Sequence, residues 1–472
     1  MTINSESRSE IATSPQPKMT LQSQLSTLKI PTVSINRDQL MDDVHFTAKF
    51  GMGERWGESP TDIGMARLAL SDSDKLVRDW FIETVKSFGC KVHVDEMGNI
   101  FAIRPGKKEG LPTVMGSHLD TQPAGGRYDG ILGVLAGVAA LRALHEGEVE
   151  TEYPVGVVDW TNEEGARFPQ CMMASGVWAG VTDVAKVHQI ADIDDANATV
   201  KSELQRIGYL GSTKAHWTAT PLAAHFELHI EQGPILEASH QRIGAVQGVQ
   251  ASKWFTITVT GRESHTGATN FENRSDALLA SAKMILRSHQ VATQFSSLAS
   301  TGLLNLKPGS TNTVPGVVTF SLDLRSSNDK NIDLMEKMLQ EDFEKIAKDE
   351  EVGAINAGCT RGRGCTVSWQ VDSDAKVAKF DEECIECIEK GSEALFGQAA
   401  ASLTRRMYSG AGHDSVHTST RVPTAMIFVP CREGLTHNPA EYCTEEDCGN
   451  GAQVLLNAVL RYDQLRSMKM SS

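Results

Sequence analysis

Apolar and polar residues alternate along most of the chain with the periods of an α/β protein. Short apolar runs that end in polar residues predict buried strands at Pro112–Met115, Val155–Val158 and Thr424–Val429. Segments with apolar positions at helical spacing predict helices at Asp74–Phe88 (with Ser73 as N-cap), Asp129–His145, Phe380–Phe396 and Glu445–Arg466. Strands that alternate with helices and end in polar residues are typical of an α/β sheet enzyme.

The middle of the chain follows a different pattern. Phe255–Val259 and Val318–Arg325 alternate strictly, which predicts strands with one buried face, and Asp276–Gln290 and Asn331–Lys348 predict helices. This pattern predicts a small α+β domain at residues 253–369, inserted into a main domain formed by residues 31–252 and 370–472. The Gly/Arg-rich stretch Gly358–Gly364 is expected to lead back to the main domain.

Charge limits the partners of this chain. It has 472 residues, of which 45 are basic and 60 acidic, and a formal net charge of -15. This balance argues against nucleic acid and against an anionic membrane surface, although a few arginines in one cleft would still bind a small anionic substrate. The apolar run Ile131–Leu144 is too short to span a bilayer.

The N-terminal segment and the cysteines bear on location. Residues 1–30 are rich in serine and proline and predict a disordered tail without the hydrophobic region of a signal peptide. The nine cysteines are an odd number and scattered, which favours a reducing compartment. We therefore expect a cytoplasmic protein. Cys384 and Cys387 form a CxxC, but their place on a predicted helix favours two separate thiols over a zinc-binding pair.

The stretch Gly116–Thr121 follows the first buried strand and carries His118 and Asp120. A strand period of two places both side chains on one face, which suits a metal-binding imidazole oriented by a neighbouring carboxylate. Asp129, at the mouth of the next predicted helix, is a second ligand candidate. An isolated His-x-Asp is more often structural, so this stretch alone does not define a site.

Further candidates follow along the chain. The segment His225–Glu231 alternates with strand period and places four polar residues on one face, namely His225, Glu227, His229 and Glu231. Such a face is usually only solvated, yet four His/Glu residues in alternation favour a ligand among them. The adjacent pair Glu163–Glu164 follows the strand Val155–Val158.

Six of these residues combine into a candidate metal site: His118, Asp129, Glu163, Glu164, His229 and His437. Three imidazoles with two or three carboxylates suit Zn²⁺ or a similar first-row metal. Within the pair Glu163–Glu164, one carboxylate can bind metal while the other stays free to move protons. Nucleotide binding is set aside, because the glycines between residues 125 and 133 have neither the P-loop nor the Rossmann spacing.

Matching motifs cover nearly the whole chain beyond the tail: Gly116–Thr121, Asp129–Gly130, Asn162–Pro169, Glu227–Pro234, Gly410–Asp414 and His437–Pro439. In these motifs the chain resembles the dinuclear-zinc amidohydrolases and peptidases related to aminoacylase and carboxypeptidase G, and within them the branch that hydrolyses N-carbamoyl compounds. The resemblance implies an α/β fold, with a mixed-sheet, zinc-peptidase-like catalytic domain and an inserted α+β dimerisation domain. It also implies a homodimer that acts on a small anionic ureido substrate.

The resemblance further implies a role for each site residue. Two Zn²⁺ ions per subunit, or two other divalent ions, would bind between five ligands, with Asp129 shared: His118, Asp129, Glu164, His229 and His437. A histidine at position 229 is typical of the carbamoyl-hydrolysing branch, whereas peptidase relatives have a carboxylate. Glu163 would be the general base and His265 a second catalytic group. The implied substrate contacts are Gln232, His265, Asn312, Arg325, Gly412 and His413.

The implied reaction is hydrolysis of N-carbamoyl-β-alanine to β-alanine, carbon dioxide and ammonia, the final step of reductive pyrimidine degradation. Allantoate and N-carbamoyl-L-amino acids are alternative substrates, and a non-catalytic binding protein is a remote alternative. Arg325 lies two residues from Asp323 at the end of a predicted strand. On its own this pair would be an ordinary surface ion pair, whereas the resemblance implies a clamp for the substrate carboxylate.

Overall fold

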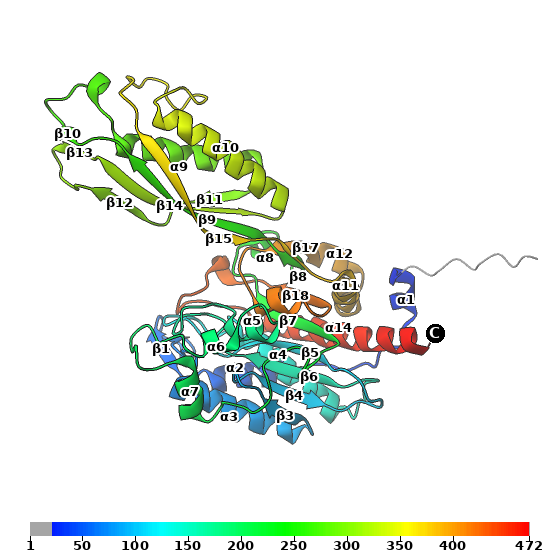
Figure 1. Ribbon diagram of the computed structural model, residues 1–472. Coiled ribbons are helices and arrows are strands. Elements are labelled where there is room, and N and C mark those ends of the chain that lie inside the picture. The colour runs from blue at the N-terminus through cyan, green and yellow to red at the C-terminus, as the bar shows by residue number, and fades with distance from the viewer. Residues whose placement is uncertain (1–20, 472) are drawn as a thin grey trace, which may run out of the picture.

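The computed structural model describes residues 21–471, which form two units (Figure 1). The larger unit is built on a nine-stranded sheet and the smaller one on a five-stranded sheet. Among the described residues, no helix has the length and hydrophobicity that a membrane span requires.

The larger sheet is mixed. Its spatial order is β16 (Ala378–Lys379), β8 (Ile243–Val249), β18 (Thr424–Val429), β7 (Ala224–Ile230), β5 (Thr113–His118), β6 (Val155–Trp160), β4 (Ile100–Arg104) and β3 (Lys91–Val94), with β17 (Thr404–Ser409) also paired to β8. The central strands β18, β7, β5 and β6 run parallel, whereas β8 and β4 flank them in the antiparallel sense. The predicted α/β class with a mixed sheet is therefore confirmed.

One face of this sheet is covered by long helices. Helix α4 (Ile131–Glu146) packs on β5, β6 and β7, and α14 (Glu445–Ser471) lies between α4 and α11 (Glu382–Phe396). Helix α4 is apolar on nearly every side because it is enclosed in this layer. Gly137 permits its close approach to the sheet, since a Cβ atom there would lie 2.7 Å from Val157 Cγ2.

The opposite face is covered by short helices, α5 (Met173–Trp178) and α13 (Asp414–Thr418). The side chains of β7 show the two faces: Leu228 packs against Gly451 of α14, while its neighbour Glu227 accepts a hydrogen bond from Ser415 of α13. Trp160 and Trp178 form the centre of a separate small core on this side.

The remaining elements of the larger unit lie around its sheet. They are α1 (Leu21–Thr27), α2 (Arg37–Thr47), β1 (Met52–Arg55), β2 (Ile63–Met65), α3 (Asp72–Ser87), α6 (Val184–Val187), α7 (Val200–Ile207), α8 (Ile235–Ala238), α12 (Ala400–Leu403) and the 3-10 turns Gly397–Ala399 and Arg432–Gly434.

The smaller unit is an antiparallel sheet with helices on one face (Figure 1). Its strands are β9 (Ala251–Thr260), β11 (Leu298–Ser300), β12 (Leu304–Lys307), β14 (Val317–Ser326) and β15 (Thr366–Ala375), and its helices are α9 (Ala277–Gln294), α10 (Asp329–Ala347) and the 3-10 turn Phe271–Asn273. In β14 every second residue is buried, so that Phe320 and Leu322 pack in the core while Asp323 and Arg325 lie on the other face. Strands β10 (Ser264–His265) and β13 (Thr313–Val314) form a separate ribbon.

The chain enters and leaves the smaller unit at one place. Ala375, at the end of β15, pairs with Ser252 of β9, and Ala378 of β16 pairs with Val249 of β8. The predicted boundary at residues 369 and 370 falls inside β15, and Gly358–Gly364 leads into this strand rather than back to the larger unit. β15 is an edge strand whose first half alternates, with Val367 and Trp369 packed against the core, but the alternation ends at the irregularity between Val371 and Ser373, and mostly polar residues follow.

Two local expectations also differ from the structure. Residues 21–27 of the predicted disordered tail form α1, because Leu21 and Leu25, one helical turn apart, pack against the core; residues 1–20 lie outside the described part of the chain. Helix α3 begins at Asp72 and not after Ser73. Ser71 is its N-cap, with its hydroxyl accepting from the backbone N–H of Asp74 at 3.2 Å.

Candidate metal centre and active site

The candidate site lies at the edge of the larger sheet where its parallel strands end. His118 ends β5, Glu163 and Glu164 follow β6, His229 is near the end of β7, and His437 follows β18. Parallel strands bring their carboxyl ends to a common edge, so residues far apart in the sequence meet here. Asp129 joins them from the turn before α4.

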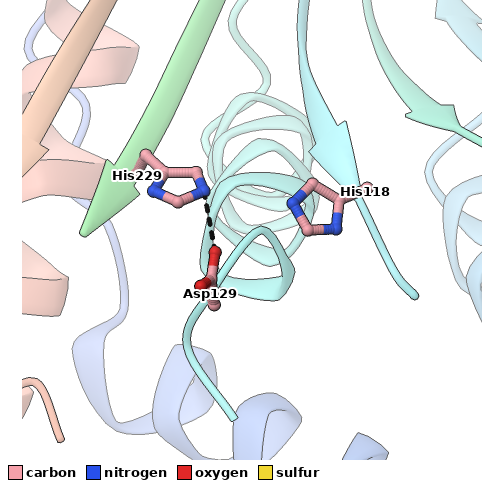
Figure 2. Close-up of side chains that lie close together, drawn as sticks. All are labelled: His118, Asp129 and His229. Carbon is pink, nitrogen blue, oxygen red and sulfur yellow. Dashed lines mark ion pairs between the residues drawn. The ribbon is translucent and has the colours of Figure 1, made fainter. Parts of the chain in front are cut away.

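His118, Asp129 and His229 form the first group of candidate ligands (Figure 2). Their ligand atoms lie within 4.8 Å of one another, and all three side chains are buried. His229 Nε2 lies 3.1 Å from Asp129 Oδ1. In Figure 2 the two rings come from neighbouring strands and the carboxylate from the mouth of α4, so the three side chains surround one small space.

The backbone fixes the tautomers of both histidines. His118 Nδ1 lies 2.9 Å from the carbonyl oxygen of Asp120, and His229 Nδ1 lies 2.8 Å from that of Ile230. Because a carbonyl oxygen only accepts hydrogen bonds, each Nδ1 carries a proton, and Nε2 is left as the ligand atom. Burial also lowers the pKa of His118 to about 4, so this imidazole is neutral. Both rings are oriented as metal-binding histidines usually are.

Asp129, Glu164 and His437 form the second group. His437 Nε2 lies 3.5 Å from Asp129 Oδ2 and 3.4 Å from Glu164 Oε2. Asp129 therefore belongs to both groups and turns one oxygen to each, which is what a ligand bridging two metal ions must do. The imidazole of His437 is half exposed, so this second group is open to solvent.

Electrostatics favours cations in this space. Burial and the Asp414 carboxylate raise the pKa of Glu163 well above its usual value, and burial and Asp129 do the same for Glu164. Asp129 is the exception, since despite its burial the hydrogen bond with His229 holds its pKa well below the usual range, and Asp129 in turn raises the pKa of the buried His229 to about 9. A metal ion bound here would displace the proton that His229 and Asp129 share. A buried excess of carboxylates beside imidazole lone pairs fits divalent metal ions, and the mixed nitrogen and oxygen donors suit a first-row metal.

Glu163 lies beside the ligands without belonging to either group. Its Oε2 is 3.7 Å from His118 Nε2. The two carboxylate oxygens of Asp120 accept the backbone N–H groups of Glu163 and Glu164, each at 3.2 Å. The sequence-based role for Asp120 is thus corrected: its carboxylate holds the Glu163–Glu164 turn, and only its backbone carbonyl orients His118. A carboxylate fixed beside the ligands, but free of them, suits a general base.

The shared ligand Asp129 is held by residues that the sequence analysis missed or assigned to substrate. Gln232 Nε2 donates to Asp129 Oδ2 at 2.8 Å, and Thr436 Oγ1 lies 2.6 Å from the same oxygen. Glu441 Oε1 accepts the backbone N–H groups of Tyr128 and Asp129, each at 3.0 Å. Thr436 and Glu441 flank the recognised motif His437–Pro439. Their closeness to this motif in the sequence is the signal that could have identified them.

Backbone strain is concentrated at this site. Asn162, Gln232 and His437 have φ angles of 57°, 57° and 51°, in the left-handed region that non-glycine residues avoid. Each such residue costs on the order of 1–3 kcal/mol, and positions of this kind cluster at functional sites. Gly130 also has a positive φ, and a Cβ atom there would lie 2.2 Å from His118 Nε2, so only glycine leaves room for this ring.

The predicted polar face of β7 needs a correction, because the whole strand is buried and faces α13 rather than solvent. Of its four polar residues only His229 joins a group that contains Asp129. The ligand atoms of a third group, Glu227, His229 and His413, also lie within 4.8 Å of one another. Both oxygens of Glu227, however, accept from the hydroxyls of Ser117 and Ser415, which favours a structural role. Glu231 accepts backbone N–H groups at the start of α8.

Four of the predicted substrate residues lie near the ligand groups. The ring centroids of His413 and His229 are 4.5 Å apart, and Gly412 precedes His413 in the same loop. Among the described residues, Gln232 Oε1 is buried without a hydrogen-bond partner. Arg325 Nη1 donates to the carbonyl of Gly410 at 2.7 Å, so the smaller unit reaches the His413 loop.

The other two predicted substrate residues lie far from the ligands of the same chain. His265 is on β10, and the backbone carbonyl of Asn312, next to β13, accepts from the backbone N–H of Thr266 at 3.0 Å. The β10–β13 ribbon is at the far end of β14 from Arg325 (Figure 1). From Val317 to Arg325 the strand spans about 26 Å at the usual rise per residue. One chain alone therefore does not bring His265 and Asn312 to the metal centre.

Comparison with known proteins agrees with this architecture. The family model of peptidase family M20/M25/M40 matches residues 114–461, which include all the candidate ligands. The chain is 38% identical over 430 residues to an N-carbamoyl-L-amino-acid amidohydrolase of Rhizobium meliloti, covering 90% of this chain and 96% of that protein. It is 29% identical over 403 residues to a ureidoglycolate hydrolase of Arabidopsis thaliana, covering 83% and 80% of the two chains.

A solved structure gives the same result. The crystal structure of an amidase of the hydantoinase/carbamoylase family from Burkholderia multivorans matches with a TM-score of 0.82 and 38% identity, covering 91% of this chain and 98% of that one. The protein belongs to peptidase family M20/M25/M40. The resemblance of its motifs to the N-carbamoyl amidohydrolase branch of that family is confirmed.

Proposed function

We propose that this protein is a metal-dependent amidohydrolase that removes the carbamoyl group from N-carbamoyl-L-α-amino acids, giving the amino acid, carbon dioxide and ammonia. The observation that carries the proposal is the pair of ligand groups that share Asp129, with the free carboxylate of Glu163 beside them. The N-carbamoyl-L-amino-acid amidohydrolase that is 38% identical to this chain supports the substrate class.

The comparisons favour this substrate over the one expected from the sequence. The substrate expected from the sequence, N-carbamoyl-β-alanine, is the one hydrolysed by the fungal-type β-alanine synthases (β-ureidopropionases). The relatives described above are named for N-carbamoyl-L-amino acids and for ureidoglycolate instead. The α-amino-acid compound therefore replaces N-carbamoyl-β-alanine as the preferred substrate, and with it the expected place in pyrimidine degradation is left aside.

The residues divide the chemistry between them. Two divalent ions, with zinc favoured by the three imidazoles, would make water acidic and polarise the ureido carbonyl when bound by the five ligands. A ureido carbonyl is a weak electrophile because both nitrogens donate into it, so the attacking water needs a base. Glu163 takes the proton of this water and returns it to the leaving ammonia. His413, kept neutral because burial and His229 hold its pKa well below the usual range, supports the developing oxyanion.

Two groups are placed to hold the substrate. The unpartnered Oε1 of Gln232 is an acceptor for a ureido N–H, and its Nε2 is fixed by Asp129. The guanidinium of Arg325 is the candidate partner of the α-carboxylate, because a planar fork matches a carboxylate.

The active form is proposed to be a homodimer in which His265 and Asn312 of one subunit complete the site of the other. This accounts for their distance from the ligands of their own chain. His265 is exposed, and its Nδ1 accepts the backbone N–H groups of Gly267 and Ala268 at 3.1 and 3.2 Å. Nε2 therefore carries the proton and is available as a donor to a substrate oxygen.

The test is ammonia release by the zinc-loaded protein from a panel of N-carbamoyl-L-α-amino acids, N-carbamoyl-β-alanine, allantoate and ureidoglycolate. We expect the highest kcat/KM for an N-carbamoyl-L-α-amino acid. Faster turnover of N-carbamoyl-β-alanine would make the protein a β-ureidopropionase. No release from any of these compounds by fully loaded protein would overturn the proposal and favour a binding protein on the same fold.

A further inference from the structure

The guanidinium of Arg325 is held from two sides. Its Nε lies 3.2 and 3.0 Å from the two carboxylate oxygens of Asp323, and its Nη2 lies 3.0 Å from Asp323 Oδ2. On the other side, Nη1 donates to the carbonyl of Gly410 at 2.7 Å. Asp323 is on the same strand as Arg325, whereas Gly410 belongs to the larger unit. The guanidinium is therefore fixed at the junction of the two units.

This arrangement leaves one edge of the guanidinium for a ligand. A guanidinium has five N–H groups in a plane. Asp323 occupies the side formed by Nε and Nη2, and Gly410 takes one N–H of Nη1. Nη1 and Nη2 each keep one further N–H. A carboxylate that approaches end-on can accept the N–H of Nη2, and also that of Nη1 when Gly410 takes the one on the Cδ side, whereas the side-on approach is blocked by Asp323.

The position of this edge is linked to the metal centre through a short, braced loop. Gly410 is three residues from His413, a separation of at most about 11 Å. The hydroxyl of Ser409 braces the loop, since it lies 2.9 Å from His413 Nε2 and accepts the backbone N–H of Ala411 at 3.0 Å. The ring of His413 in turn packs on His229. The contact with Gly410 therefore sets where the guanidinium lies relative to the ligand groups.

We propose that Asp323 is a positioning residue for substrate specificity, which acts by holding Arg325 so that its end-on edge faces the substrate α-carboxylate when the smaller unit lies against Gly410. The proposal rests on the proposed function. Asp323 touches no substrate atom, so its loss should raise KM for substrates with an α-carboxylate and leave kcat nearly unchanged. A surface ion pair without this role would contribute little to either parameter.

The first experiment compares Asp323→Asn with wild type on an N-carbamoyl-L-amino acid and on its carboxamide, which lacks the carboxylate. We expect KM for the acid to rise about tenfold, the loss typical of one misplaced charge-assisted hydrogen-bonding partner, and KM for the carboxamide to change less than about twofold. Asp333→Asn is the matched control, because Asp333 is an exposed carboxylate of the same unit that faces Lys376 at 3.6 Å. This control should leave KM unchanged for both the acid and the carboxamide.

A second comparison shows whether Asp323 acts through Arg325. In an Arg325→Ala background, Asp323→Asn should have no further effect on KM for the acid. Additive effects of the two changes, or an equal rise in KM for the acid and the carboxamide, would overturn the proposal. Failure of the proposed function has a different signature, because wild-type protein would then hydrolyse no N-carbamoyl-L-amino acid. In that case the positioning role is tested by calorimetry, which measures the affinity of Glu163→Gln protein for the acid and for the carboxamide, with and without Asp323→Asn. A loss of affinity for the acid alone would support the role of Asp323.

Discussion

The side chain of Glu441 supports both the backbone and the side chain of Asp129. Glu441 Oε1 accepts the backbone N–H of Asp129 at 3.0 Å, and Glu441 Oε2 lies 3.0 Å from Thr436 Oγ1, which contacts Asp129 Oδ2. One buried carboxylate thus orients the ligand that both groups share. Supports of this kind are worth about 10–100-fold in metal affinity in other proteins.

Glu441→Ala should therefore weaken metal binding about 10–100-fold, because the backbone N–H groups of Tyr128 and Asp129 lose their acceptor. Competition with a fluorescent zinc chelator measures this change. Glu446→Ala, at an exposed position near the start of α14, is the control and should bind as wild type does. Unchanged affinity in Glu441→Ala would remove Glu441 from the metal centre.

The roles of Glu163 and His118 are separable. Glu163→Gln should keep its metal and lose about 10²–10⁴-fold in kcat, because the Glu163 carboxylate moves protons and binds no metal. His118→Ala should lose metal as well as activity, because it supplies a ligand atom. Elemental analysis together with steady-state kinetics distinguishes the two. A fully loaded Glu163→Gln enzyme with nearly normal turnover would show that another group is the base.

The sequence predicted which candidate ligands would lie together, because most of them follow parallel strands in short contiguous motifs, and parallel strands end at a common edge. It did not predict the supports of the site. Glu441 and the side chain of Asp120 act on backbone N–H groups, and the choice of partner depends on how separate loops pack. It also missed α1, since a single turn from Leu21 to Leu25 is stable only against the core that receives it.

Subunit complementation tests the proposed dimer. A His265→Ala chain and a Glu163→Gln chain are each expected to be nearly inactive as homodimers. If His265 acts in the site of the other subunit, a mixed dimer has one site with both defects and one site with neither. Mixing should then recover up to about half of the wild-type activity per dimer, measured as ammonia release. The same mixture without recovery, in verified heterodimers, would place His265 in its own chain's site or outside catalysis.

Acid should destabilise the larger unit through His225. Burial lowers the pKa of His225 from 6.5 to about 3, and its neutral ring accepts from Trp160 Nε1 at 3.4 Å. The unfolded chain therefore binds this proton more readily than the folded protein. The contribution of this group to stability is complete above pH 6.5 and declines by about 1.4 kcal/mol per pH unit as the pH falls toward about 3.

Urea unfolding of chelator-treated protein between pH 7 and pH 4 measures this slope without a contribution from metal release. His225→Gln lacks the titrating group, so its free energy of unfolding should depend less steeply on pH, by one proton. Parallel pH profiles for the two proteins would show that His225 does not contribute to acid sensitivity.

The pairing of Val249 with Ala378 and of Ser252 with Ala375 has a kinetic consequence. The smaller unit is joined to the larger one by a single two-stranded ribbon, so any rotation between the units must bend that ribbon. Such a rotation also breaks the hydrogen bond from Arg325 to Gly410, which joins the two units. Hinge motions in enzymes take microseconds to milliseconds and often limit product release. In this protein the stiffness of a few paired residues, far from the reacting bond, would then set the upper limit of turnover.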